Sequence, residues 1–190
     1  MTAPGEEDED GVLARRAAQG DDLAFSRLMR RHKGWLHAFA RRHLGDADAA
    51  LDVVQESFVA AWKALDRYDP ARPFSTWLGA IALNKCRDRG RRLVVRRLIL
   101  GERSIDAPGA PDYADPAAGP EGEALRSERL ARLEAAIARL PERLKEPLIL
   151  TSLEGLSQQE AADVLKVSVK TVETRVYRAR KRLAEWLGEA

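Results

Sequence analysis

Apolar residues in the first half of the chain recur at intervals of three and four. The clearest run reads Leu51, Val54, Phe58, Trp62 and Leu65. That spacing puts all five side chains on one face of an α-helix. The run predicts a helix over residues 49–65, begun by Asp46 or Asp48. Further helices are predicted over 12–20, from Asp21 or Asp22 to Leu44 with a break near Gly34, and over 76–92.

The second half of the chain shows the same helical period. Leu130, Leu133, Ile137 and Leu140 make residues 127–140 amphipathic, and Pro141 ends that helix. Pro147 suits the first turn of a further helix over 148–154. No segment with the two-residue alternation of a strand stands out, so we predict an all-α fold.

A segment without apolar periodicity separates the two halves. Residues 104–124 contain four prolines and three glycines, a composition typical of a flexible linker. We therefore expect two small helical domains on a tether. The predicted organisation is an acidic disordered tail over 1–10, a first domain over 11–100, a linker over 101–126 and a second domain over 127–190.

The end of the second domain predicts a helix-turn-helix. Ser157 with Glu160 three residues later forms a capping box for a short helix. Residues 166–168 then make a turn, and Ser168 begins a longer basic helix over 169–186. Glycine often occupies the turn position held here by Lys166, so this lysine is expected to adopt a strained, left-handed backbone.

The second helix of this motif has a polar side that suits DNA. Arginine can bond guanine with both fork donors, and lysine, serine and threonine can bond phosphates or base edges. The expected DNA-facing residues are Ser168, Lys170, Thr171, Thr174, Arg175 and Arg178. The alternative is a solvated basic helix in a bundle, with no DNA contact.

Charge is distributed unevenly along a chain whose formal net charge is only +2. Residues 84–103 contain eight bases against two acids, and residues 168–182 contain six bases against one. Two separate basic segments indicate two contacts with a polyanion.

Several classes of protein are excluded by composition. Cys86 is the single cysteine, so no internal disulfide can form, and with only three histidines in the chain we expect no metal and no cofactor. Cys86 falls on an apolar helix face, which favours an inert core thiol over a redox sensor. We find no phosphate-binding loop or nucleophile motif, so no catalytic residue and no enzyme is predicted. No window approaches a membrane span, which predicts a cytoplasmic chain without membrane insertion.

Two stretches resemble bacterial sigma factors. DVVQESFVAAWKALDRYDPARPFSTWLGAIALNKCRDRGRR, residues 52–92, resembles their second conserved region. LPERLKEPLILTSLEGLSQQEAADVL and SVKTVETRVYRARKRL, within residues 130–187, resemble the fourth. Two such regions joined by a linker in so short a chain look like an extracytoplasmic-function sigma factor, a family linked to stress responses.

The resemblance implies a docking face for core RNA polymerase. In the family, the helix corresponding to residues 49–65 docks on the clamp helices of the polymerase largest subunit. The implied residues are Asp52, Gln55, Glu56 and Val59. A plain solvated helix face is the alternative for each of them.

The resemblance also implies how the first domain meets promoter DNA. A melted strand needs cations for its phosphates and an aromatic or amide group for its bases. The helix after residue 75 matches the part that opens and reads the minus-ten element, with Trp77, Asn84, Lys85, Arg87, Asp88 and Arg91. Trp77 could instead be a core residue. The loop over 66–74 captures a flipped base in the family, which commonly has Gly-Ser before the phenylalanine, whereas this chain has Pro73.

The function implied is that of a dissociable sigma factor. It would bind core polymerase, read the minus-thirty-five element with the helix-turn-helix, and be held by an anti-sigma factor. A stand-alone helix-turn-helix regulator and a polymerase-binding adaptor that does not bind DNA are the alternatives.

Overall fold

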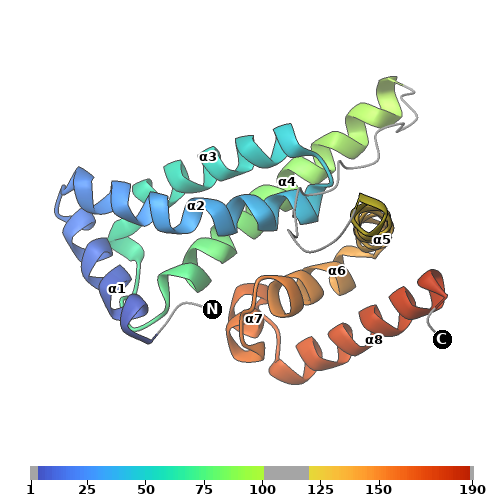
Figure 1. Cartoon of the computed structure of the whole chain (residues 1–190). Helices are drawn as coiled ribbons and strands as arrows, with labels where there is room; N and C mark the ends of the chain where they lie inside the picture. Colours follow the sequence, from blue (N-terminus) through green and yellow to red (C-terminus); the bar gives the residue numbers. More distant parts are fainter. Residues whose placement is uncertain (1–3, 101–119, 189–190) are drawn as a thin grey trace.

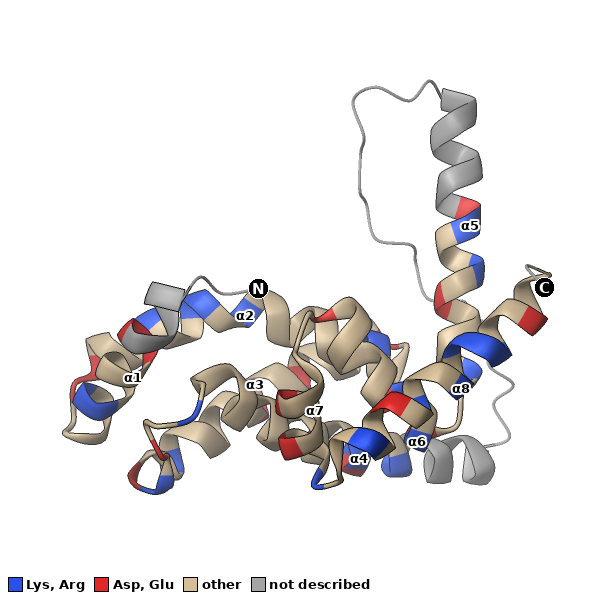
Figure 2. Cartoon of the chain, turned by 90° about the horizontal axis from the view of Figure 1, so that it is seen from below, with Lys and Arg blue, Asp and Glu red and all other residues tan. Residues whose placement is uncertain are grey.

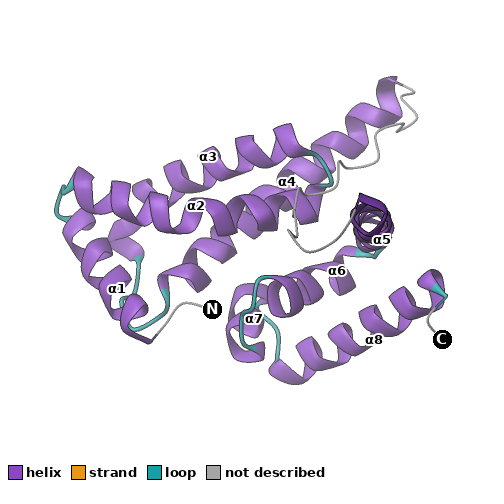
Figure 3. Cartoon of the chain, viewed as in Figure 1, coloured by secondary structure: helices purple, strands orange, loops and turns teal. Residues whose placement is uncertain are grey.

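The computed structural model describes residues 4–100 and 120–188, with side chains from 9–93 and 128–188. The predicted all-α fold class is confirmed, since the described residues form helices and no strand (Figure 3). Helices α1 (Pro4–Ala18), α2 (Asp22–Leu44), α3 (Ala47–Lys63) and α4 (Phe74–Leu100) build the first domain. Helices α5 (Pro120–Arg139), α6 (Glu142–Leu148), α7 (Gln158–Leu165) and α8 (Val169–Leu187) build the second.

Local signals set the starts of α2 and α3 in the first domain. The Asp21 side chain accepts a hydrogen bond from the Ala24 amide at 3.0 Å, and Asp46 accepts one from Ala49 at 2.8 Å. These bonds satisfy amide groups that a helix start leaves without an internal partner. Gly45 ends α2 in the left-handed conformation that glycine adopts freely.

The break expected near Gly34 is wrong, because α2 runs unbroken from Asp22 to Leu44. Leu28, Leu36 and Phe39 are fully buried on either side of the glycine. Their burial stabilises the helix by more than the roughly 1 kcal/mol that a glycine costs in a helix interior. Tertiary packing therefore overrides the weak local propensity.

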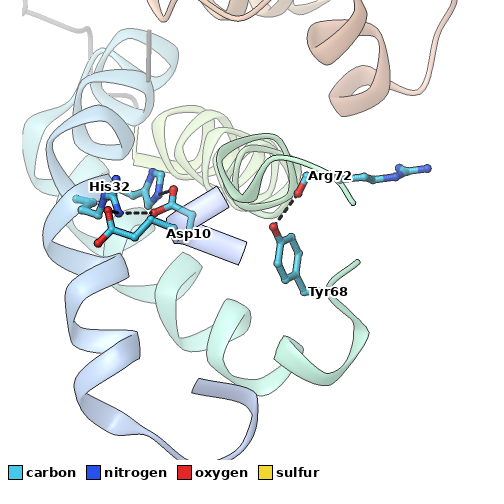
Figure 4. Close-up of polar contacts among 6 residues, drawn as sticks. Asp10, His32, Tyr68 and Arg72 are labelled. Atoms are coloured by element: carbon cyan, nitrogen blue, oxygen red, sulfur yellow. Dashed lines mark hydrogen bonds and ion pairs between the residues drawn. The ribbon is translucent and has the colours of Figure 1, made fainter. Parts of the chain in front are cut away.

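The start of the chain differs from the disordered tail expected over 1–10. The backbone of α1 is helical from Pro4, and Asp10 is almost fully buried. The Asp10 carboxylate lies 2.7 Å from His32 Nε2 (Figure 4). It also lies 3.1 Å from Arg31 Nη1. These α2 partners fix the end of the acidic run, and no sequence period reveals them. Residues 1–3 lie outside the described part.

The second domain begins and turns differently from the prediction. The backbone of α5 starts at Pro120, inside the linker expected over 101–126, whose residues 101–119 lie outside the described part. The helix predicted over 148–154 is wrong in its boundaries. Instead α6 begins directly after Pro141, and Pro147 lies inside it, followed by a π-helical turn over Ile149–Leu153.

The two domains lie against each other in the described structure (Figure 1). Helix α7 packs on α4, and α5 packs on α2. Helix α8 packs on α5, α6 and α7, and lies on the side of the second domain away from α2 and α3. The contact between domains thus leaves one face of α8 turned to solvent.

Candidate functional site

The helix-turn-helix has the predicted geometry. The Ser157 hydroxyl accepts from the Glu160 amide at 3.2 Å, and the Glu160 carboxylate accepts from the Ser157 amide at 2.7 Å. Lys166 has φ 55° and ψ 47°, and it is the one non-glycine residue with positive φ in the described part. The expectation of a left-handed lysine in the turn is therefore confirmed.

The DNA-facing side predicted on α8 is accessible along its first turns. Ser168 caps the helix by accepting a hydrogen bond from the Thr171 amide at 3.2 Å. Lys170 and Arg178 are exposed, whereas Thr171, Thr174 and Arg175 are half-buried. Figure 2 shows basic segments along α8, and Lys170 pairs with Glu173 at 3.0 Å. The six predicted residues thus lie together at one end and one side of α8.

Sequence reasoning missed Tyr177 on the same helix. Its side chain is 69% exposed although it is a large aromatic residue. It follows Lys170 by seven residues and Thr174 by three, a spacing that puts the three side chains on one face. Exposed aromatic residues beside cations can stack on or pack against nucleic acid. The helical spacing of Tyr177 from Lys170 and Thr174 could therefore have identified it from the sequence.

The minus-ten residues predicted on α4 do not form one free surface. Asn84, Asp88 and Arg91 are exposed, and Asp88 pairs with Arg91. Lys85 Nζ lies 3.4 Å from a Glu56 oxygen of α3. Arg87 donates two hydrogen bonds of 2.7 Å to Glu146 of the second domain.

Trp77 is half-buried in an aromatic cluster at the start of α4. Its ring centroid lies 5.2 Å from that of Tyr68 and 5.5 Å from that of Phe74. The Tyr68 hydroxyl donates to the Arg72 carbonyl at 2.7 Å, which ties down the loop between α3 and α4 (Figure 4). Trp77 therefore supports the loop that precedes it, as the core interpretation expected, and keeps one part of its ring accessible.

The predicted docking face on α3 divides into two parts. Asp52 pairs with Arg89, and Glu56 pairs with Lys85, so both acids lean toward α4. Val59 is 54% exposed between them and the end of the helix. Gln55 lies at the border of a groove on the other side.

That groove runs between α2 and α3 and has a volume of about 630 Å³. Its lining combines the apolar residues Leu23, Met29, Leu51, Val54 and Phe58 with three bases. The bases are Arg27, Arg30 and Lys33, at helical spacing along α2. Leu23 is 75% exposed. An apolar lining with bases beside it suits an amphipathic helix that carries acids.

The Cys86 thiol lies in the core of the structure. Burial, and then the nearby Glu146 charge, raise the pKa of the Cys86 thiol to about 12. Cys86 is fully buried, so the structure places it as the core residue we expected. Within residues 9–93 and 128–188, no cluster of three or more His, Cys, Asp or Glu could hold a metal ion.

None of the helices in the described part is both long and apolar enough to span a membrane.

Comparison with known proteins agrees with this architecture. Residues 28–94 match the family model for sigma-70 region 2, and residues 130–183 match that for sigma-70 region 4. The sigma factor CnrH of Cupriavidus metallidurans is 43% identical over 183 residues, covering 95% of each chain. The ECF sigma-E factor of Haemophilus influenzae is 34% identical over 176 residues, covering 90% of this chain and 92% of its own.

Solved structures give the same result. CnrH in complex with the cytosolic domain of CnrY superposes with a TM-score of 0.71 at 37% identity, covering 95% of this chain and 98% of CnrH. The chain therefore belongs to the extracytoplasmic-function sigma factors of bacterial RNA polymerase. It is a transcription initiation factor and not an enzyme.

Proposed function

We propose that this sigma factor divides promoter recognition between its two domains. The second domain reads the minus-thirty-five duplex through α8, and the first opens and reads the minus-ten element through α4. The observation that carries this proposal is the helix-turn-helix, whose second helix presents Lys170, Tyr177 and Arg178 to solvent. Such a helix fits a major groove.

The minus-thirty-five contact uses the first turns of α8. Arg175 and Arg178 supply fork donors for guanine or phosphate, and Lys170 supplies a point charge. The hydroxyls of Ser168, Thr171 and Thr174 lie beside them for phosphate oxygens. Tyr177 extends this surface toward the middle of the helix.

The minus-ten contact uses α4 and the loop before it. Asn84 reads a base edge, while Lys85, Arg87 and Arg91 bind strand phosphates. The loop over 66–74 receives a flipped base, with Trp77 beneath it. Asp88 orients Arg91, with which it pairs.

The polymerase contact uses the outer face of α3 and the adjoining groove. Asp52, Gln55, Glu56 and Val59 form the face, and Gln55 also lines the groove with its apolar residues and three bases. The partner is the clamp-helix segment of the largest subunit. A helix that brings both apolar and acidic side chains matches this surface.

Control by an anti-sigma factor follows from the likeness to CnrH, a sigma factor solved with the cytosolic domain of CnrY. Such an inhibitor would occupy the surfaces that polymerase and DNA need. The site of action is the cytoplasm, where the polymerase works.

Transcription with purified core polymerase tests the proposal. The chain should stimulate initiation from a promoter that has both elements, with starts mapped beforehand after overexpression in cells. If core enzyme alone initiates as well as the mixture does, the division of promoter recognition fails. A stand-alone regulator would instead bind duplex DNA tightly without polymerase, as a dimer on a near-palindrome.

A further inference from the structure

The boundary between the two domains carries opposite charges on its two sides. Arginines of the first domain meet glutamates of the second in three pairs: Arg41 with Glu134 at 3.4 Å, Arg42 with Glu154, and Arg87 with Glu146 at 2.7 Å. A fourth polar contact joins Thr76 to Glu160 at 3.5 Å. In every one of these ion pairs the cation belongs to the first domain, the one proposed to bind the melted DNA strand, and the acid belongs to the second.

The pair between Arg87 and Glu146 has the most specific geometry. Arg87 donates from Nε to one Glu146 oxygen and from Nη2 to the other, both at 2.7 Å. The Glu146 side chain is only 4% exposed. His43 Nε2 lies 3.6 Å from the same carboxylate. Glu146 thus sits in a pocket made by cationic and imidazole groups of the first domain.

A carboxylate and a phosphate bind an arginine side chain in the same way. Each offers two oxygens to the parallel N–H donors of the guanidinium fork. When both fork donors are held by Glu146, they are not available to a strand phosphate. The acidic side chain therefore stands where a phosphate oxygen pair would stand.

We propose that Glu146 is an internal competitor of promoter DNA at Arg87, which holds this sigma factor in a closed form until a strand phosphate or a partner displaces it. The inference rests on the proposed minus-ten role of Arg87. It adds an autoinhibitory contact between the domains, which the proposed division of promoter recognition does not require.

The closed form is suited to reversal. Removing charges from water offsets much of their attraction, so the ion pairs at this boundary hold the closed form by a modest net free energy. At Glu154 burial raises the pKa, and the Arg42 charge only partly offsets that effect. At Glu146 burial also acts to raise the pKa, but the Arg87 fork and His43 outweigh it and lower the pKa, so this pair favours the closed form. Apolar contact also contributes, since α7 packs on α4 and Val164 of α7 is buried.

The proposed competition predicts how separation of the two domains changes DNA binding. Once the domains separate, the Arg87 fork becomes free to bind a strand phosphate. DNA binding by the free protein is then limited by the closed form rather than by the contacts themselves.

The test compares the full-length protein with Glu146→Gln, and with Glu128→Gln as a control of equal charge change at an exposed position of α5. Small-angle X-ray scattering measures the radius of gyration. Fluorescence anisotropy measures binding of a labelled single-stranded DNA of mixed sequence, about 16 nucleotides long. Glu146→Gln should enlarge the radius and tighten DNA binding about tenfold, because one charge-assisted fork is lost. Glu128→Gln should change neither.

Two further variants separate the outcomes. Glu154→Gln, which leaves Arg87 paired, should enlarge the radius less and leave DNA binding near the wild-type value. If Glu146→Gln does not fold, Glu146→Asp replaces it, because the shorter side chain cannot hold both Arg87 donors in the same geometry. Adding Arg87→Ala to Glu146→Gln should abolish the gain in DNA binding.

The inference would be overturned if the wild-type protein already had the large radius of gyration of separated domains, or if Glu146→Gln had the same radius as a compact wild type. Either result would leave the proposed function standing. An enlarged radius without tighter DNA binding would overturn the competition, and would count against the minus-ten role of Arg87 itself.

Discussion

Lys85 Nζ of α4 and a Glu56 carboxylate oxygen of α3 lie 3.4 Å apart. This pair joins a residue proposed to bind DNA to one proposed to bind polymerase. Asp52 and Arg89 repeat the arrangement one turn away. The two proposed surfaces of the first domain are therefore electrostatically coupled, since whichever partner binds one member of a pair changes the charge seen by the other.

Lys85→Gln should weaken single-stranded DNA binding and change holoenzyme assembly only slightly, because the Lys85–Glu56 pair is partly exposed and contributes little. Removing one phosphate contact lowers the slope of log affinity against log salt by about 0.7 for a single strand. A salt titration of DNA binding measures that slope, and co-elution with core polymerase measures assembly. Arg15→Gln, an exposed base on α1, is the control. An unchanged slope would remove Lys85 from the DNA surface.

Asp52→Ala combined with Gln55→Ala should reduce assembly with core polymerase without unfolding the domain. The Asp52–Arg89 pair is partly solvent-exposed, at 54% and 26% of the two side chains. Exposed pairs contribute between 0 and about 1 kcal/mol, so little stability is lost. Gel filtration with core polymerase and a thermal melt measure the two effects. Asp48→Ala, an exposed acid of the same helix, should behave as wild type, and normal co-elution of the double variant would refute this face.

Arg175→Ala should weaken minus-thirty-five binding by about 1–3 kcal/mol if its fork holds a guanine. The loss should be larger for the cognate sequence than for a scrambled one, because a phosphate contact would affect both equally. Promoter binding by holoenzyme on both duplexes measures this difference. Arg132→Ala, an exposed arginine on α5, controls for net charge, and an unchanged sequence preference would exclude Arg175 from base reading.

Local signals predicted the helix-turn-helix well, and tertiary contacts explain what the sequence did not reveal. The Ser157–Glu160 capping box and the left-handed Lys166 depend on residues a few positions apart, so their pattern is visible in the chain. The Arg87–Glu146 pair joins residues 59 positions apart, in different domains, and no periodicity encodes it. The unbroken helix at Gly34 and the buried Asp10 likewise depend on packing against distant residues.

Native Cys86 should react with a thiol reagent about a thousandfold more slowly than the unfolded chain at pH 8. Burial, followed by the Glu146 charge, raises its pKa from 9.0 to about 12, and each unit is a factor of ten in thiolate. The raised pKa adds stability that is fully present below pH 9 and is lost as pH rises toward about 12. Labelling with and without urea measures the rate. Rapid labelling of the folded protein would contradict the buried thiol.

Lys166→Gly should raise the free energy of unfolding by about 0.5–1 kcal/mol. A side chain at φ 55° places its Cβ close to the following carbonyl oxygen, a cost of roughly 1–2 kcal/mol that glycine does not incur. The greater freedom of glycine in the unfolded chain cancels part of this gain. Urea unfolding measures the change, and Lys166→Ala is the matched control because it removes the charge and keeps the Cβ. If the alanine variant gains as much as the glycine variant, the charge of Lys166 rather than its backbone accounts for the effect.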